Sequence, residues 1–298
     1  MPHFGMMLGN GFTIDLGEKI GINPSEPLSF FKGNSQFFHQ FMKNTPAIEK
    51  ELLHIANTEK NDYIAIEKFM KSPFYTKEKD YQLRRFLAFS YSALQMQLEH
   101  YNIATWKWTH WLRKNKDGIQ FAISFNYDLL FENALQMANI PFFRTGSSDK
   151  KVGIPISKPH GSIDFDVLPS GLLTWHYAPA RSHWNHNHVY TIPKQSWLHP
   201  RYEADIIPPH KENDQRVFQW VKEGIQAFLD YVYRLDHFVI IGLSYNEADR
   251  QEVNQYLEHL RPRTKVYVID PKPNEQLLEK IRSLGLHLEI NKETGLPW

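Results

Sequence analysis

The chain has 298 residues, of which 42% are hydrophobic and 14% aromatic, and its formal net charge is +1. This composition is typical of a globular protein with a sizeable core and excludes disordered and fibrous classes. The nearly neutral charge does not indicate a nucleic-acid-binding protein. Cysteine is absent, which excludes disulfides, thiolate zinc sites and cysteine nucleophiles.

The N-terminus and the apolar runs bear on where the protein acts. The first residues, MPHFGMMLGNGF, contain no basic segment, and their apolar stretch is too short for a signal peptide. No run of about 18 apolar residues occurs, so we expect no membrane span. The expected location is therefore the cytoplasm.

Strand patterns open the chain and dominate its second half. Residues 4–8 form an apolar run before a glycine-rich turn, and this run is expected to be a short buried strand. From residue 35 to residue 116, apolar side chains recur at helical spacing, which predicts several helices. Beyond them we expect strands at 119–125, 152–156, 237–241, 265–269 and 286–290, and helices at 129–138, 216–233, 246–260 and 275–284.

This alternation of strands and helices predicts an α/β fold, in which a Rossmann-like parallel sheet carries helices on both faces. We expect a single domain over residues 1–298, with residues 35–116 as a helical insertion after the first strand. Residues 162–214 are rich in Pro, His, Trp and Asn and show little periodicity. They are expected to form a long loop region with some short strands, and so long an irregular segment suggests either a functional role or mobility.

Polar or glycine-containing segments follow the predicted strands. Ligands of open parallel sheets bind outside the carboxyl ends of the strands, so these segments would meet at one edge. Each segment alone has an ordinary structural explanation, such as a tight turn or a helix cap, and only their convergence predicts a site. The segments are Gly9-Asn10-Gly11-Phe12-Thr13, Ser124-Phe125-Asn126-Tyr127-Asp128, His160-Gly161-Ser162, Gly242-Leu243-Ser244 and Ile269-Asp270.

In this order, the segments resemble the motifs of the sirtuin-like NAD⁺ hydrolases. In that family a GAG-type loop is followed by T-Q-N-I-D, His-Gly and G-T-S segments and by a strand that ends near the adenosine. The resemblance covers nearly the whole chain outside the helical insertion. The stretches LGNGF, FNYD, KPHGSID and IIGLSYNEAD resemble in particular the bacterial antiphage and abortive-infection branch.

Two features depart from the protein-deacetylating sirtuins. Those enzymes carry a four-cysteine zinc module after the His-Gly motif, which a chain without cysteine cannot build, so no zinc is expected. Phe125 also stands where that family usually has glutamine, which puts one ribose or nicotinamide contact in doubt. The branch without the zinc module is associated with NAD⁺ hydrolysis rather than deacetylation.

The resemblance implies a role for each site residue. His160 would act as general base, Asn126 would orient water and the ribose hydroxyls, and Asp128 would accept a hydrogen bond from the nicotinamide amide. Because nicotinamide leaves as a neutral molecule, neither a general acid nor a metal is expected. The residues expected to contact the diphosphate or the adenosine ribose are Gly9, Asn10, Gly11, Phe12, Thr13, Gly242, Ser244 and Asp270.

Two local patterns admit other interpretations. The histidines within residues 176–210 suggest a metal site, but no HExxH helix or adjacent carboxylate frames them, and a solvated or interfacial aromatic loop is the simpler interpretation. Trp106, Trp108 and Trp111 are interleaved with basic residues, as in a nucleic-acid groove. Trp108 and Trp111 also share a helix face, which favours packing in the core or against another subunit. The histidines are His176, His183, His186, His188, His199 and His210.

These observations predict an NAD⁺ hydrolase, with NAD⁺ as substrate and no resident cofactor, that acts as an antiphage effector. The alternatives are a non-catalytic NAD⁺ or ADP-ribose sensor that signals to a partner protein and, third, a zinc-free deacylase. The presence of both Asn126 and His160 favours the enzyme. An unrestrained hydrolase would deplete the NAD⁺ of its own cell, so we expect gating by a homo-oligomer or an activating partner. The tryptophan-rich helices of the insertion are the expected contact surface.

Overall fold

The computed structural model describes residues 2–30, 35–166, 189–199, 204–208, 218–292 and 295–298. The strands are β1 (Phe4–Leu8), β2 (Ile119–Ser124), β3 (Phe142–Arg144), β4 (Ile154–Ser157), β5 (Gly161–Asp166), β6 (Tyr190–Thr191), β7 (Ala204–Ile206), β8 (His237–Ile241), β9 (Lys265–Ile269) and β10 (His287–Asn291). The α-helices are α1 (Gly11–Ile20), α2 (Ser35–Lys43), α3 (Leu53–Ala56), α4 (Asp62–Met70), α5 (Lys77–Leu98), α6 (Lys107–Asn115), α7 (Leu130–Met137), α8 (Gln219–Val232), α9 (Arg250–Leu257) and α10 (Glu275–Ser283). Short turns of other helix types are η1 (Ile48–Leu52), η2 (Ile103–Thr105), η3 (Lys116–Gly118) and η4 (Lys194–Ser196).

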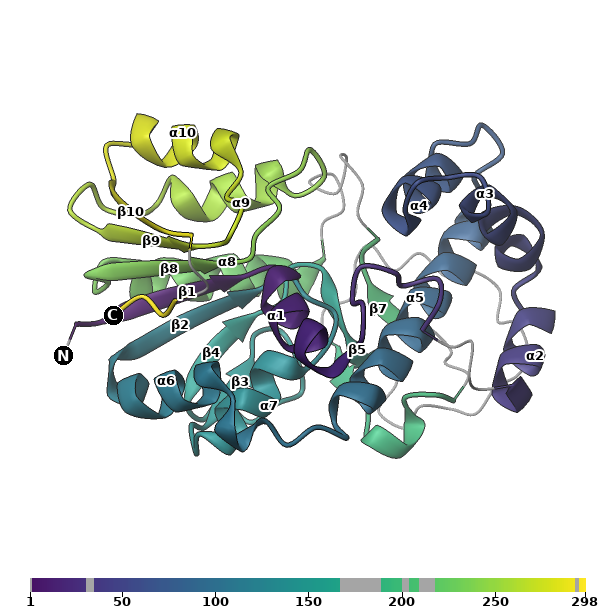
Figure 1. Ribbon diagram of the computed structural model, residues 1–298, viewed down its shortest axis with the longest axis horizontal. Coiled ribbons are helices and arrows are strands. Elements are labelled where there is room, and N and C mark those ends of the chain that lie inside the picture. The colour runs from purple at the N-terminus through teal and green to yellow at the C-terminus, as the bar shows by residue number, and fades with distance from the viewer. Residues whose placement is uncertain (1, 31–34, 167–188, 200–203, 209–217, 293–294) are drawn as a thin grey trace.

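A seven-stranded parallel sheet forms the centre of the molecule, in the order β10-β9-β8-β1-β2-β4-β3 (Figure 1). From β1 the chain continues to β2 on one side, and it later places β8 on the other side of β1. The carboxyl ends of β1 and β8 therefore flank the topological switch point, where open sheets bind their ligands. The predicted α/β fold with a Rossmann-like parallel sheet is confirmed.

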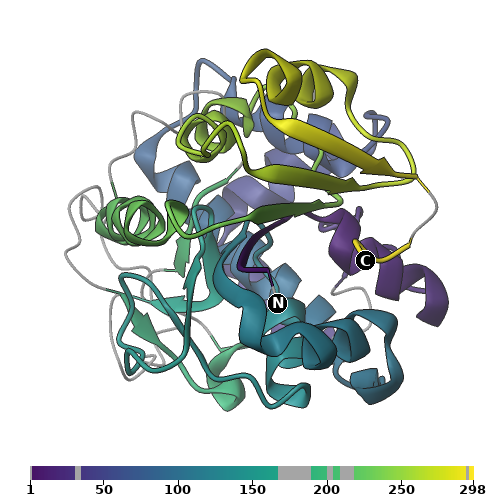
Figure 2. The ribbon, with the colours of Figure 1, turned by 90° about the vertical axis from the view of Figure 1, so that its left-hand side faces the viewer.

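Successive side chains of β1 belong to two different apolar clusters, one on each face of the sheet, because strand side chains point alternately to opposite sides. Met6 belongs to the apolar cluster that includes α1, α5, α6 and α7, and Met7 belongs to the cluster that includes α8, α9 and α10. Figure 2 shows α9 and α10 on one side of the sheet and α1 and α6 on the other. Both faces are covered, as expected for a parallel sheet.

Of the helices between β1 and β2, α2, α3, α4 and α5 extend away from the sheet, with α2, α3 and α4 at the far side of α5 (Figure 1). The long helix α5 packs against β5 and β7, which with β6 form a separate three-stranded antiparallel sheet. Arg84 of α5 fixes this contact, because its Nη2 lies 3.0 Å from Asp205 Oδ1 and its Nε donates to the Ile206 carbonyl at 2.7 Å. Both charged side chains are almost fully buried.

The expected strands in the second half correspond to β2, β4, β8, β9 and β10. Helix α9 begins at Arg250, four residues after the start expected at residue 246. The backbone takes positive φ values at Gly242 and Tyr245, 54° and 49°, so the preceding loop turns before the helix can form. Strand β3 was not predicted, since three residues are too few to show an alternating pattern.

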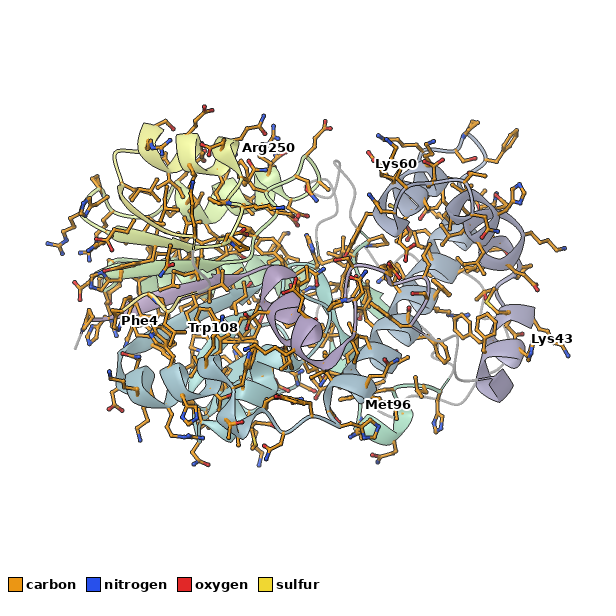
Figure 3. The ribbon with its side chains drawn as sticks, viewed as in Figure 1. Phe4, Lys43, Lys60, Met96, Trp108 and Arg250 are labelled. Carbon is orange, nitrogen blue, oxygen red and sulfur yellow. The ribbon has the colours of Figure 1, made fainter. Side chains whose placement is uncertain are left out.

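The tryptophans of the insertion do not form a contact surface for another subunit. Trp106, Trp108 and Trp111 are 3%, 1% and 2% exposed. The Trp108 ring lies 5.7 Å from that of Phe12, and the Trp111 ring lies 5.3 Å from that of Phe4. In Figure 3, Trp108 lies within the packed interior. The expected interface role of these side chains is wrong, and the interpretation as core packing is confirmed.

Candidate functional site

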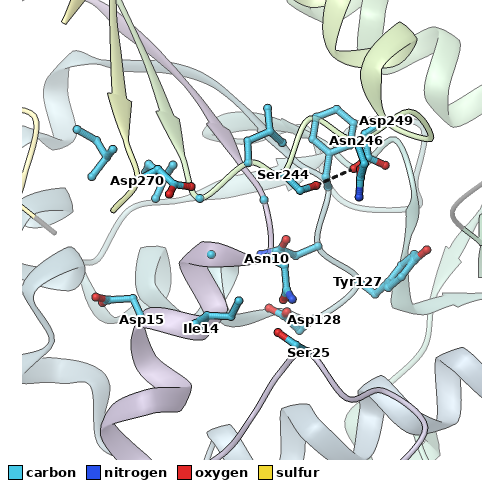
Figure 4. A pocket seen from close by; sticks show the side chains of 18 of the residues that line it. Asn10, Ile14, Asp15, Ser25, Tyr127, Asp128, Ser244, Asn246, Asp249 and Asp270 are labelled. Atoms are coloured by element: carbon cyan, nitrogen blue, oxygen red, sulfur yellow. Dashed lines mark hydrogen bonds between the residues drawn. The ribbon is translucent and has the colours of Figure 1, made fainter. Parts of the chain in front are cut away.

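A cavity of about 470 Å³ opens at the carboxyl edge of the central sheet. Its volume lies within the range of roughly 300–1,000 Å³ that is common for small-molecule sites. Each of the segments that follow β1, β2, β4, β8 and β9 contributes lining residues (Figure 4). The lining includes most of the residues expected from the sequence: Gly9, Asn10, Gly11, Asn126, Asp128, His160, Gly242, Ser244 and Asp270.

Glycines join the loops after β1 and β8 at the floor of the cavity. A Cβ on Gly11 would lie 2.4 Å from Gly242 Cα, so a side chain there would separate the two loops. The amides of Gly9 and Gly11 donate to the carbonyls of Ile241 and Gly242, each at 2.9 Å. These two amides are thus already bonded within the protein. Both glycines line the cavity, and their expected contact with the diphosphate stays a prediction. Their glycines serve the contact between the loops.

Thr13 holds the two polar side chains that follow β2. Its Oγ1 donates to Asp128 Oδ2 at 2.9 Å and accepts from Asn126 Nδ2 at 3.2 Å. Thr13 is fully buried and does not line the cavity, so its expected contact with the diphosphate is corrected. It positions Asn126 and Asp128 instead.

Phe12 is the other expected binding residue that the structure places elsewhere. Its side chain is fully buried and is not part of the cavity lining. The ring lies 4.8 Å from that of Trp106 and 5.9 Å from that of Phe131. Helix α1 begins at Gly11, directly after the turn, and so directs Phe12 into the core while Ile14 and Asp15 line the cavity. The role of Phe12 is packing.

Asp128 caps the start of α7 and also lines the cavity wall. Its Oδ1 accepts from the Leu130 amide at 3.0 Å, at the start of α7. The fully buried Lys158 donates from Nζ to the Asp128 carbonyl at 2.8 Å and to Glu132 Oε1 at 3.0 Å. Burial raises the pKa of Asp128, although the Lys158 charge and the hydrogen bonds from Leu130 and Thr13 oppose that shift.

His160 pairs with carboxylates that the sequence analysis did not identify. Its Nε2 lies 2.7 Å from Glu252 Oε2 and 3.8 Å from Asp249 Oδ1. Burial lowers the pKa of His160, but Glu252, through its charge and hydrogen bond, together with Asp249 and a backbone hydrogen bond at Phe125, raises it to about 9. This shift favours the protonated ring at neutral pH. A general base has to begin neutral, so this arrangement does not suit the role that the resemblance implied for His160.

Helices α4, α5 and α6, which lie between β1 and β2, supply one wall of the cavity. Tyr63 of α4, Tyr91 of α5 and Trp108 of α6 are lining residues. Asn10 Nδ2 donates to Tyr63 Oη at 3.3 Å, and the hydroxyls of Tyr63 and Tyr91 lie 3.2 Å apart. The Tyr91 ring in turn lies 4.9 Å from that of Tyr127. Sequence reasoning missed these tyrosines because aromatic residues at helical spacing are usually core residues.

The cavity has two distinct ends. In Figure 4, Tyr127 and Asp249 lie at one end and Asp270 at the other, with Asn10 between them. Asp270 accepts only a local hydrogen bond among those described, from the Lys272 amide at 2.7 Å, and partial burial raises its pKa.

The histidine-rich stretch is mostly outside the described residues, which include His199 but not His176, His183, His186, His188 or His210. Within the part of the chain that the structure describes, no group of three or more His, Asp or Glu side chains could hold a metal ion. None of the described helices combines the length and the apolar character needed to cross a bilayer.

No protein-family model and no curated protein matches the chain. Among solved structures it is similar to one described as "Structural Basis for the Mechanism and Regulation of Sir2 Enzymes". The two chains are 14% identical, with 95% of this chain and 93% of the other covered, and the TM-score is 0.29. What the cavity binds is therefore argued from its own residues.

Proposed function

We propose that this protein hydrolyses NAD⁺ at the nicotinamide–ribose bond and releases nicotinamide and ADP-ribose. The main support is the cavity at the switch point, where Asn126 and Asp128 lie at the carboxyl end of β2 and are held together by Thr13. A crevice at this position in a parallel sheet is the usual binding place of a nucleotide. The order of the motifs, which resembles that of the sirtuin-like NAD⁺ hydrolases, supports the same substrate.

The charges of the cavity suit the proposed reaction. Cleavage of an N-glycosidic bond develops positive charge on the ribose, as in other glycoside hydrolyses. Carboxylates fixed in a buried wall stabilise such a charge without further reorganisation. Asp128 and Asp249 both line the cavity and are 2% and 9% exposed. We therefore place the nicotinamide ribose between them, beside Asn126.

The other half of the dinucleotide would extend toward Asp270. An acidic side chain after a strand of a nucleotide-binding sheet commonly accepts hydrogen bonds from ribose hydroxyls. Since the amides of Gly9 and Gly11 are occupied, the diphosphate would be held by Asn10, whose side-chain amide keeps a second N–H besides the one donated to Tyr63. Ser244, whose hydroxyl donates to Asp249, would lie beside the diphosphate in the middle of the cavity.

The direct test mixes purified protein with NAD⁺ and quantifies nicotinamide and ADP-ribose by chromatography. We expect both products in equal amounts from the wild type, in the presence of an activator if the isolated protein is silent. Binding of NAD⁺ by calorimetry without any product, under every activating condition, would instead support the sensor alternative. An acylated-lysine peptide included in a parallel reaction tests the deacylase alternative.

We propose that the reaction needs no metal. The nicotinamide leaving group is already cationic before the bond breaks, so a Lewis acid has little to contribute. Turnover is expected to be unchanged after dialysis against a chelator. Loss of activity that Zn²⁺ restores would contradict this and would direct attention to the histidine-rich stretch.

We also propose an antiphage role with gated activity, either in a homo-oligomer or with a partner protein. Activation then requires that the assembled state bind NAD⁺ or the transition state better than the resting state does. Because Trp106, Trp108 and Trp111 are buried, the contact surface has to lie elsewhere. Light scattering and NAD⁺ turnover measured on the same samples test the proposal, and a fully active monomer would contradict it.

A further inference from the structure

The carboxylates around His160 have different positions relative to the cavity. Glu252 of α9 makes the short contact with His160 Nε2 at 2.7 Å and does not line the cavity. Asp249, directly before α9, lies 3.8 Å from the same nitrogen and does line the cavity. One carboxylate therefore binds the ring from behind, and the other faces the space where a substrate would lie.

We propose that Asp249, rather than His160, accepts the proton of the attacking water, and that Glu252 is a positioning residue that keeps His160 protonated. This inference rests on the proposed hydrolysis of NAD⁺, and it assigns the general base of that reaction.

The hydrogen bonds support this division of roles. His160 Nε2 is engaged by Glu252, so this nitrogen cannot also take a proton from water unless the pair separates. Asp249 Oδ2 accepts a hydrogen bond from Ser244 Oγ at 3.2 Å, drawn as a dashed line in Figure 4. Its Oδ1 is the oxygen nearer to His160. The Asp249 carboxylate is thus oriented from two sides while it remains at the cavity wall.

The electrostatic setting also favours Asp249 as the base. Burial raises the pKa of Asp249, the positive charge of His160 opposes this shift, and the negative charge of Glu252 adds to it. A raised pKa makes a carboxylate a better proton acceptor, while the adjacent cation keeps it ionised. The polar groups that face this pair come from several elements: Glu252 from α9, Ser244 from the loop after β8, Tyr63 from α4 and the backbone of Phe125 after β2.

The bond between ribose C1′ and the nicotinamide nitrogen breaks, and its electron pair stays with nicotinamide, which leaves neutral. The water oxygen forms a bond to C1′, and one of its protons moves to the Asp249 carboxylate. ADP-ribose leaves, and Asp249 returns the proton to solvent. His160 keeps its proton throughout and fixes the carboxylate.

The pH dependence of kcat separates the two possible bases. If neutral His160 were the base, kcat would rise about tenfold per pH unit from pH 6 until the pH approached the pKa of about 9. With Asp249 as base, kcat falls only in the acidic range, where the carboxylate becomes protonated, and is flat from pH 7 to pH 8.5. The rate without enzyme is subtracted at each pH, because NAD⁺ also decomposes in alkali.

Substitutions of matched size test each residue. Asp249→Asn keeps the shape but removes the proton acceptor, and we expect kcat to fall about 10²–10⁴-fold. Glu252→Gln is expected to lower the pKa of His160, which NMR of the imidazole nitrogens measures directly. Glu247→Gln is the control, because Glu247 is exposed in the same loop and outside the cavity lining. It should leave kcat within about twofold of the wild type, as expected for a surface substitution.

The outcomes are distinguishable. An active Asp249→Asn variant, or a wild-type kcat that rises through pH 8.5, would overturn the assignment of Asp249 while NAD⁺ hydrolysis stands. An unchanged pKa of His160 in Glu252→Gln would overturn the positioning role, whether or not the protein is active. A wild type that never releases nicotinamide would overturn the proposed function and with it the assigned base.

Discussion

The two ends of the cavity are built in different ways. At one end, contacts between distant parts of the chain hold His160 and Asn126, which are 4% and 7% exposed. At the other end, Asp270 is half-buried, and the hydrogen bond described for its side chain comes from its own loop. The first end is therefore preorganised for chemistry, whereas the second is suited to binding. Substitutions at the first should change kcat, and substitutions at the second should change KM.

The largest effect is expected for Asn126→Ala, at the preorganised end. The substitution removes the amide that would orient water and the ribose hydroxyls, and we expect kcat to fall about 10²–10⁴-fold. Circular dichroism should show that the fold survives. A variant with the kcat of the wild type would show that this end is not where the bond breaks.

A substitution at Gly11 tests the junction between the two ends. A methyl group there would lie 2.4 Å from Gly242 Cα, so Gly11→Ala should destabilise the protein by about 1–3 kcal/mol through overpacking. Thermal unfolding without ligand measures this effect. An unchanged Tm combined with lost NAD⁺ binding would instead support a direct contact between Gly11 and the diphosphate.

Thr13→Val should have an intermediate effect. Valine preserves the volume but removes the hydroxyl that joins Asn126 to Asp128, and losing such a bond in a buried site costs about 1–3 kcal/mol. We expect kcat to fall at least about tenfold with little change in KM. Thr13→Ser, which keeps the hydroxyl, is the matched control, and equal losses in both variants would contradict the positioning role.

The smallest effect is expected for Asp270→Asn, at the binding end. The amide retains one acceptor oxygen, so KM for NAD⁺ should rise by roughly two- to tenfold, the equivalent of about one hydrogen bond. Steady-state kinetics should show kcat unchanged. A fall in kcat with constant KM would remove the proposed distinction between the two ends.

Local sequence patterns were enough to predict the central sheet and the segments that surround the cavity. Residues 237–241 and 265–269 form strands with the predicted bounds, because short apolar runs between turn residues are a local pattern. The parallel topology then brings Asn126, His160 and Ser244 to one edge, since all carboxyl ends of such a sheet point the same way.

The direction of individual side chains and the contacts between distant residues depend on the packed fold, and no local pattern predicts them. An apolar helix face fits a core and an interface equally well, so the burial of Trp108 had no unique local signature. The direction of Phe12 and Thr13 depends on α1 starting at Gly11, where a one-residue shift rotates every side chain by about 100°. Glu252 lies 92 residues from His160, and no spacing rule connects them. Strands β1 and β2 separate β8 from β4 in the sheet, and the contact forms because the loop after β4 and the helix α9 after β8 meet at the carboxyl edge, which is a property of the whole fold.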